Sequence, residues 1–101
     1  MPWYTAECLY RSELASCTAD EQLCEYRYFL VKADDDQAAN EKARELAAAK
    51  QHGYLNANGE KVHWVLEAVI DTKQILNEDL SEGTEIFHRY VSRPPCASRQ
   101  R

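Results

Sequence analysis

Hydrophobic and polar residues alternate most regularly from residue 54 to residue 71, which makes this stretch the clearest secondary-structure signal in the chain. A period of two over this length is typical of a β-strand with one buried face. Asn58-Gly59 interrupts the stretch with residue types that tolerate the positive φ of a tight turn. The pattern predicts a hairpin with a short strand at 54–57 and a long strand after the turn. The buried face of the long strand is predicted to carry Val62, Trp64, Leu66, Ala68 and Ile70.

Two more strands are predicted nearer the N-terminus, over residues 3–12 and 23–33. The loop between them, residues 13–22, is rich in small and acidic residues. The second strand is enriched in β-branched and aromatic residues, which suit a pleated sheet. In the first strand the alternation places on one face Tyr4, Ala6, Cys8 and Tyr10.

A hairpin centred near Ser16 would pair these two strands and would place Cys8 opposite Cys24. That register offers a redox pair, although two small buried thiols are the commoner arrangement for free cysteine. It also gathers four tyrosines, which serve equally as ordinary sheet packing and as a binding face. The four are Tyr4, Tyr10, Tyr26 and Tyr28.

A helix is predicted after the second strand, from the acidic run at residues 34–36 to about Gln51. Asp34 is the expected N-cap of a capping box with Gln37, and carboxylates favour the positive end of a helix. Gly53 is the expected residue just past the C-terminus. The predicted apolar stripe is built of small side chains that let the helix lie close to a sheet, namely Ala39, Ala43, Leu46 and Ala47.

Residues 72–83 are predicted to be a connection, and residues 84–93 a final strand that Pro94-Pro95 ends, because proline cannot donate to a strand ladder. The fold class is therefore α+β. We expect a single domain over residues 1–93, with a mostly antiparallel sheet of four to five strands in ββαβββ order and one helix on one face. Residues 94–101 are expected to be a flexible tail. One helix covers one face of such a sheet, so the second face must be polar, self-associated or covered by a partner.

The net charge of −5 bears on which class of macromolecule the protein can bind. Residues 94–101 hold two Arg and no acid, so residues 1–93 carry 10 basic and 17 acidic side chains. A body this acidic repels phosphate backbones, so no nucleic-acid partner is expected. The chain has no run of about 18 apolar residues and does not begin like a signal peptide. We therefore expect no membrane association, a cytoplasmic location and reduced cysteines.

The sequence contains no phosphate-binding glycine loop, HExxH or GxSxG motif. No catalytic residue, metal site or cofactor is predicted. Arg27 and Arg89 are candidates for orienting an acidic ligand through bidentate bonds. His63 and His88 would meet only if the long strand pairs with the last one. The candidate binding residues are Tyr26, Arg27, Tyr28, His63, Trp64, Glu67, His88 and Arg89.

Several short motifs occur together along the chain: WYxA from Trp3, RxFLVxA from Arg27, YLNxxGExVxW from Tyr54 and GTEI from Gly83. Together they resemble a small bacterial family catalogued as a domain of unknown function, over about residues 3–92. The resemblance implies a small soluble bacterial protein and carries no catalytic residues to transfer.

These patterns are compatible with three classes of function. The first is a non-catalytic interaction module that forms a homodimer or binds a protein, for example a basic one as a toxin-neutralising immunity protein does. The second is a small-ligand binder that uses the open sheet face, with Trp64 or the tyrosines as its floor. The third is an enzyme that depends on His63 or His88, for which the spacing assembles no nucleophile, base and orienting group.

Overall fold

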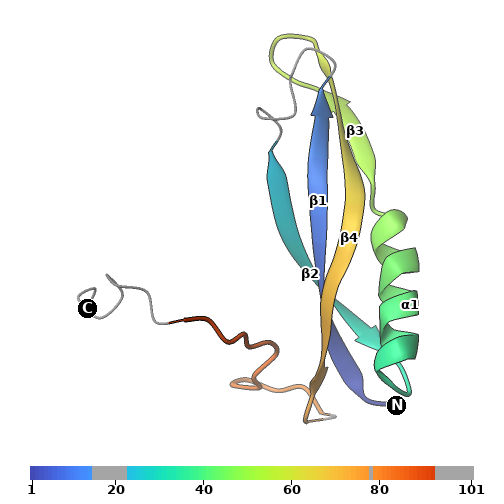
Figure 1. Cartoon of the computed structure of the whole chain (residues 1–101), viewed down its shortest axis with the longest axis vertical. Helices are drawn as coiled ribbons and strands as arrows, with labels where there is room; N and C mark the ends of the chain where they lie inside the picture. The colour runs from blue at the N-terminus through green and yellow to red at the C-terminus, as the bar shows by residue number, and fades with distance from the viewer. Residues whose placement is uncertain (15–22, 78, 93–101) are drawn as a thin grey trace, which may run out of the picture.

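The computed structural model describes residues 1–14, 23–77 and 79–92. These residues form an antiparallel sheet with a single helix on one face (Figure 1). This confirms the predicted α+β class and the single helix. The strands lie side by side in the order β2-β1-β4-β3. The elements are β1 (Trp3–Leu14), β2 (Cys24–Lys32), α1 (Asp36–Ala48), β3 (His52–Leu55) and β4 (Lys61–Ile75).

Helix α1 begins at an acidic cap and ends earlier than predicted. The N-cap is Asp35, not Asp34, and its carboxylate accepts a 2.8 Å hydrogen bond from the Ala38 amide. The helix ends at Ala48, because β3 already starts at His52. Gly53 therefore lies in a strand instead of capping the helix. A Cβ at that position would lie 3.2 Å from the Nδ1 atom of His63, so a larger residue there would press on the His63 ring.

The core lies between α1 and the sheet, with β1 at its centre and β2 and β4 on either side. Tyr4, Ala6, Cys8 and Tyr10 are all buried on the face of β1 that α1 covers, as the alternation predicts. The helix contributes only small side chains, since Ala39, Ala43 and Ala47 are buried and Leu46 is exposed. Such a stripe brings the helix backbone close to the sheet. The phenol of Tyr10 donates a 2.7 Å hydrogen bond to the carbonyl of Ala47.

The turn between β3 and β4 agrees with the sequence prediction. Gly59 has a φ of 79°, and its amide bonds to the carbonyl of Asn56. The side-chain oxygen of Asn56 accepts from the amides of Asn58 and Glu60, both at 2.9 Å. The short strand itself covers residues 52–55, two residues earlier than the predicted 54–57.

Two irregularities in β4 change which of its side chains face the helix. The pairing with β1 shifts between Glu7 and Cys8 and again between Leu9 and Tyr10, so Glu67 and Ile70 have no partner in the register. An extra residue in one strand exchanges the two faces for the residues beyond it. As a result Val69 packs on the core while Ala68 falls on the opposite face, where the strict alternation places them the other way round.

The β1–β2 hairpin has a different register from the predicted one. Cys8 lies opposite Arg27, not Cys24. A displacement by three residues turns β2 over, because side chains alternate between the two faces. Tyr26 and Tyr28 therefore lie on the face away from Tyr4 and Tyr10, and the predicted gathering of the four tyrosines is wrong. The observed register places Glu7 opposite Tyr28 and so avoids a like-charge pair with Glu25.

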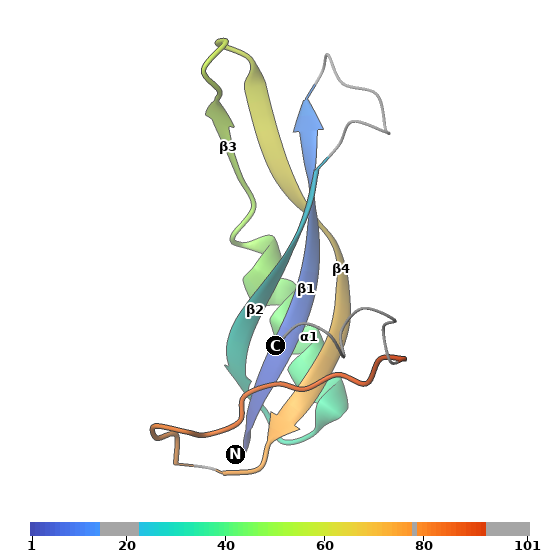
Figure 2. The same cartoon turned by 90° about the vertical axis from the view of Figure 1, so that its left-hand side faces the viewer.

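The segment after β4 does not form the predicted last strand. Strand β4 continues to Ile75, and residues 84–92, called the arm below, are extended but pair with no strand among the described residues. A turn precedes the arm, where the Thr84 amide bonds to the carbonyl of Ser81 and Gly83 has a φ of 92°. The arm crosses the sheet face opposite α1 and then leaves the body of the molecule (Figures 1 and 2). The predicted 94–101 tail lies outside the described residues.

The helix found in the described part of the chain is too short and too polar to cross a bilayer.

Candidate functional site

The sheet face opposite α1, called the open face, is built of cross-strand rows of side chains from β2, β1 and β4. The register of the three strands aligns one residue from each strand in every row. The end of the face near the N-terminus of β1 is called lower and the other end upper. From the upper end the rows are Cys24–Arg11–Val65, Tyr26–Leu9–Ala68, Tyr28–Glu7–Asp71 and Leu30–Thr5–Lys73.

Glu7 is a buried carboxylate in the middle of this face, with only 2% of its surface exposed. Its Oε2 atom accepts a 2.9 Å hydrogen bond from the phenol of Tyr28 and lies 3.2 Å from the guanidinium of Arg89. A buried charge is tolerated when it is paired and hydrogen-bonded, as it is here. The hydrogen bond to Glu7, and after it the loss of solvent, raises the pKa of Tyr28 above its ordinary value.

Three contacts hold the arm on the open face. They are made by Thr5, Glu7 and Tyr28, and these three residues are called the arm seat below. The hydroxyl of Thr5 bonds to the carbonyl of Ile86. The ring of Phe87 meets that of Tyr28 edge-on, with centroids 5.1 Å apart. Arg89 completes the set through its ion pair with Glu7. Because Tyr28 and Arg89 both contact the carboxylate of Glu7, the arrangement fixes the arm and presents no free reactive group.

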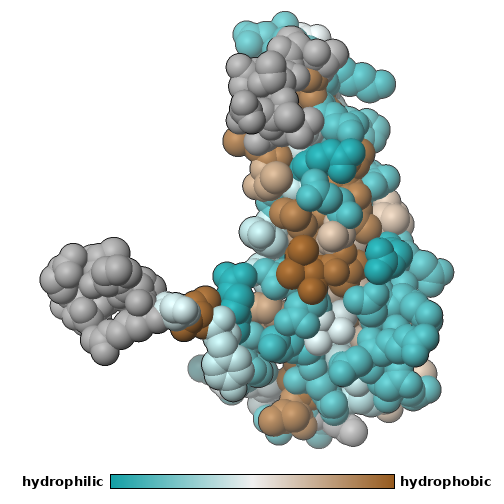
Figure 3. Space-filling view, viewed as in Figure 1, coloured by the Kyte–Doolittle hydropathy of each residue, from teal (hydrophilic) through white to brown (hydrophobic). Residues whose placement is uncertain are grey.

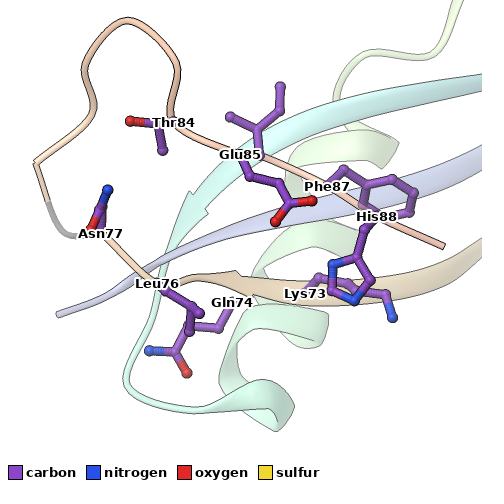
Figure 4. Close-up of a pocket in the computed structure, with 9 residues that line it drawn as sticks. Lys73, Gln74, Leu76, Asn77, Thr84, Glu85, Phe87 and His88 are labelled. Atoms are coloured by element: carbon purple, nitrogen blue, oxygen red, sulfur yellow. The ribbon is translucent and has the colours of Figure 1, made fainter.

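A small cavity lies where the arm meets the lower end of β4. Its volume is about 130 Å³, and its lining includes Lys73 of β4 together with Glu85 and His88 of the arm (Figure 4). Pockets that enclose metabolite-sized ligands are typically about 300–1,000 Å³. The size of this cavity therefore suits a few water molecules or a small ion better than a metabolite.

The structure brings together only part of the predicted binding set. Tyr28 and Arg89 meet at Glu7, Tyr26 lies one row above, and His88 lies in the arm with its ring 5.6 Å from that of Tyr90. Tyr26 and Tyr28 lie on the open face, and His88 and Arg89 belong to the arm that crosses it.

The other predicted residues are dispersed. Arg27 lies on the helix face with its guanidinium 5.1 Å from the centre of the Tyr10 ring, so it does not act together with Arg89. Trp64 also packs on the core side, and its indole N–H donates to the phenol of Tyr54. Glu67 lies 3.7 Å from Arg11, near the upper end of the sheet.

The two histidines of the hypothetical enzyme do not meet. His63 pairs with Glu13 at the upper end of β4, whereas His88 lines the cavity beside Lys73. Ten strand residues separate position 63 from position 73, which corresponds to about 33 Å. The geometry therefore gives no support to a shared histidine site.

Sequence reasoning did not identify Thr5, Glu7 and Phe87 as site residues. All three depend on the arm, which the sequence pattern presents as an ordinary last strand. The one local signal was Glu7 itself, an acidic residue in the middle of a mostly hydrophobic strand. A carboxylate in such a place needs a partner from elsewhere in the chain.

The redox pair offered as an alternative is absent, and the favoured interpretation of two buried thiols is right for Cys8 and wrong for Cys24. Cys8 is buried under the helix, while Cys24 is exposed on the open face, and both are free thiols. Burial, followed by the nearby Glu7, raises the pKa of the Cys8 thiol, which makes it a poor nucleophile. Within residues 1–14, 23–77 and 79–92, no three His, Cys, Asp or Glu side chains are grouped so as to hold a metal ion.

A family model described as a domain of unknown function, DUF4288, matches residues 3–88. The chain belongs to the DUF4288 family. The DUF4288 match runs from the first residue of β1 into the arm, so it includes the arm seat and Phe87. Arg89 and Tyr90 lie just beyond it. No curated protein and no solved structure matches the chain.

We expect Arg89→Ala to lower the free energy of unfolding by about 1–2 kcal/mol. The substitution leaves Glu7 with Tyr28 alone, and the effect stays moderate because Arg89 is itself largely exposed and the loosened arm admits water. Urea denaturation at fixed protein concentration measures the difference. Arg44→Ala is the matched control, since Arg44 is also exposed and bonds to Asn40 on its own helix. Equal stabilities of the two variants would mean that the arm is not anchored through Glu7.

Proposed function

We propose that this DUF4288 domain is a non-catalytic interaction module that forms a homodimer through the upper part of its open face. The observation that carries the proposal is the Tyr26 row, which consists of Tyr26, Leu9 and Ala68. Tyr26 is 54% exposed on the edge strand β2, on a sheet face whose lower part the chain crosses with its own arm. Tyrosine in such a place is typical of a contact surface, because it combines a large apolar ring with a polar tip.

The edge of the sheet supports the same proposal. β2 is the outermost strand on its side, and on the open face its side chains Tyr26, Tyr28 and Leu30 are all exposed. A nine-residue edge strand without a neighbour is a template for pairing with another chain. The described part of β2 contains no proline that would block such pairing.

A homodimer accounts for these features better than a small-ligand site does. The cavity of about 130 Å³ is too small for most metabolites, and it lies beside the arm instead of at the exposed tyrosine. A basic protein partner is suggested by the net charge of −5 alone. Self-association through the open face covers the exposed tyrosine, and the open edge of β2 borders the same surface. The proposed setting is the bacterial cytoplasm, where Cys8 and Cys24 remain reduced.

The test compares Tyr26→Lys with Tyr54→Lys by sedimentation velocity over a range of protein concentrations. Tyr54 is similarly exposed but lies on β3, and it pairs with Val62 on the helix side of the sheet. A lysine at position 26 would be buried without a partner in the dimer, so we expect the dissociation constant to rise at least about tenfold. Tyr54→Lys should dimerise as the unmodified chain does. The same dissociation constant for both variants would place the interface elsewhere.

A further inference from the structure

The end of the arm carries apolar side chains that its own chain does not cover. Tyr90 is 89% exposed and Val91 is 69% exposed, immediately after the three contacts at the arm seat. In Figures 1 and 2 the arm leaves the sheet on the open-face side, away from α1. Figure 3 shows hydrophobic surface on the last described part of the arm, standing off the body. The seat thus fixes the root of the arm and directs its tip outward.

The open face has two parts, of which one is occupied by the arm and the other is not. Its lower part, around Thr5 and Glu7, is occupied by the root of the arm. Its upper part, the Tyr26 row, has an exposed aromatic ring and no described contact from the arm. Each copy of the chain therefore has one exposed apolar tip and one row in which the exposed Tyr26 stands beside the half-buried Leu9 and Ala68, and both lie on the same side of the molecule.

Twofold symmetry brings the tip of one copy to the row of another. In a closed dimer the same patch serves on both copies. A twofold axis parallel to the strands would set lower part against lower part, and the two arms would collide. An axis between the faces and perpendicular to the strands sets the lower part of each face opposite the upper part of the other. Each arm then points at the Tyr26 row of its partner.

We propose that residues 90–92 of each copy dock on the Tyr26 row of a second copy, so that the dimer has two equivalent arm contacts. This inference rests on the proposed homodimer and specifies its contact. Tyr90 packs against Tyr26 and Leu9 of the other copy, and Val91 extends the apolar contact. Aromatic pairs of this kind are favourable beyond the area they bury.

Charge favours a second copy as the occupant. Residues 1–93 hold 10 basic and 17 acidic side chains, whereas residues 94–101 hold two Arg and no acid. The arm therefore approaches an acidic body with a basic sequence following it. Two chains of net charge −5 repel at long range, so this attraction acts only at short range, where it favours the orientation that brings the end of one arm to the acidic body of the other copy.

The experiment places the photo-crosslinking residue p-benzoylphenylalanine at position 90 of the full chain, in an equal mixture of unlabelled and ¹⁵N-labelled protein. We expect a covalent dimer whose crosslinked peptides join one labelled and one unlabelled chain. The crosslinks should map to β2 residues 24–28, to Leu9 or to β4 residues 65–68. The same probe at Tyr54, on the helix side of the sheet, is the control and should give no covalent dimer.

The outcomes separate this inference from the proposed function. A dimer in solution whose probe at position 90 reacts within its own chain, reacts elsewhere on the second copy or fails to react overturns the inference and leaves the homodimer standing. A monomer in solution overturns both. Tyr90→Glu should weaken dimerisation at least tenfold while Tyr90→Phe keeps it near the unmodified level. Because Tyr90 is so exposed, neither change should affect folding, which thermal unfolding of the monomer checks.

Discussion

Tyr10→Ala is expected to lower the free energy of unfolding by about 3–5 kcal/mol, a large part of the stability of a domain this size. Tyr10 is fully buried between the sheet and α1, and its phenol donates a hydrogen bond to the carbonyl of Ala47. The guanidinium of Arg27 lies 5.1 Å from the centre of its ring. Removal of the ring leaves a cavity, removes one of the donors to the Ala47 carbonyl and removes the surface on which Arg27 lies.

Urea denaturation of the two proteins at equal concentration measures this effect, because the stability of a homodimer depends on protein concentration. Tyr10→Phe separates the two contributions, since it keeps the ring and loses only the hydrogen bond, at a cost of about 1–2 kcal/mol. Tyr54→Ala removes an exposed tyrosine and serves as the control. A loss at position 10 no greater than at position 54 would contradict the placement of Tyr10 in the core.

Ala43→Leu is expected to lower the free energy of unfolding by about 1–3 kcal/mol, which is a large effect for adding apolar atoms. Leucine is as good a helix former as most residues, so propensity does not oppose the change. The cost comes from packing, because Ala43 is buried where α1 lies against the sheet. A longer side chain there forces the helix away from β1 and β4.

The control for this substitution is Ala48→Leu, which adds the same atoms to an exposed position on the same helix. We expect Ala48→Leu to stay within about 0.5 kcal/mol of the unmodified chain. Thermal unfolding followed by circular dichroism compares the two. If Ala43→Leu proved as stable as Ala48→Leu, the close approach of helix and sheet would be wrong.

Local patterns in the sequence were enough to predict the fold class and the single helix. The alternation in residues 4–10 correctly identified the buried face of β1, and Asn58-Gly59 correctly identified the β3–β4 turn. These features depend on neighbouring residues along the chain. The acidic run before α1 also predicted its start, to within one residue.

The features that the sequence did not predict depend on contacts between distant residues. The two irregularities in β4 exist only with respect to β1, so a strict alternation placed Ala68 in the core. The β1–β2 register is set by how both strands meet the rest of the fold, and the predicted pairing was displaced by three residues. The arm has the alternation of a strand but pairs with none of the strands in the described residues, since it crosses the sheet instead of extending it.

The candidate site was predicted only in part for the same reason. Tyr28 and Arg89 were singled out because of their chemistry, and they do lie together. Their common partner, Glu7, could be recognised only once the arm had been placed across β1. Arg27 has the same chemistry as Arg89, but the turned-over register of β2 puts it on the helix side. Which face a residue occupies was thus the information that the sequence lacked.

The molar mass in solution, measured by size-exclusion chromatography with light scattering across a range of concentrations, tests the central claim most directly. The proposed dimer predicts twice the 11.6 kDa of the chain at micromolar concentration and above. A mass of 11.6 kDa at every concentration would contradict it, because Tyr26 and Tyr90 would then both remain exposed in the working form of the protein.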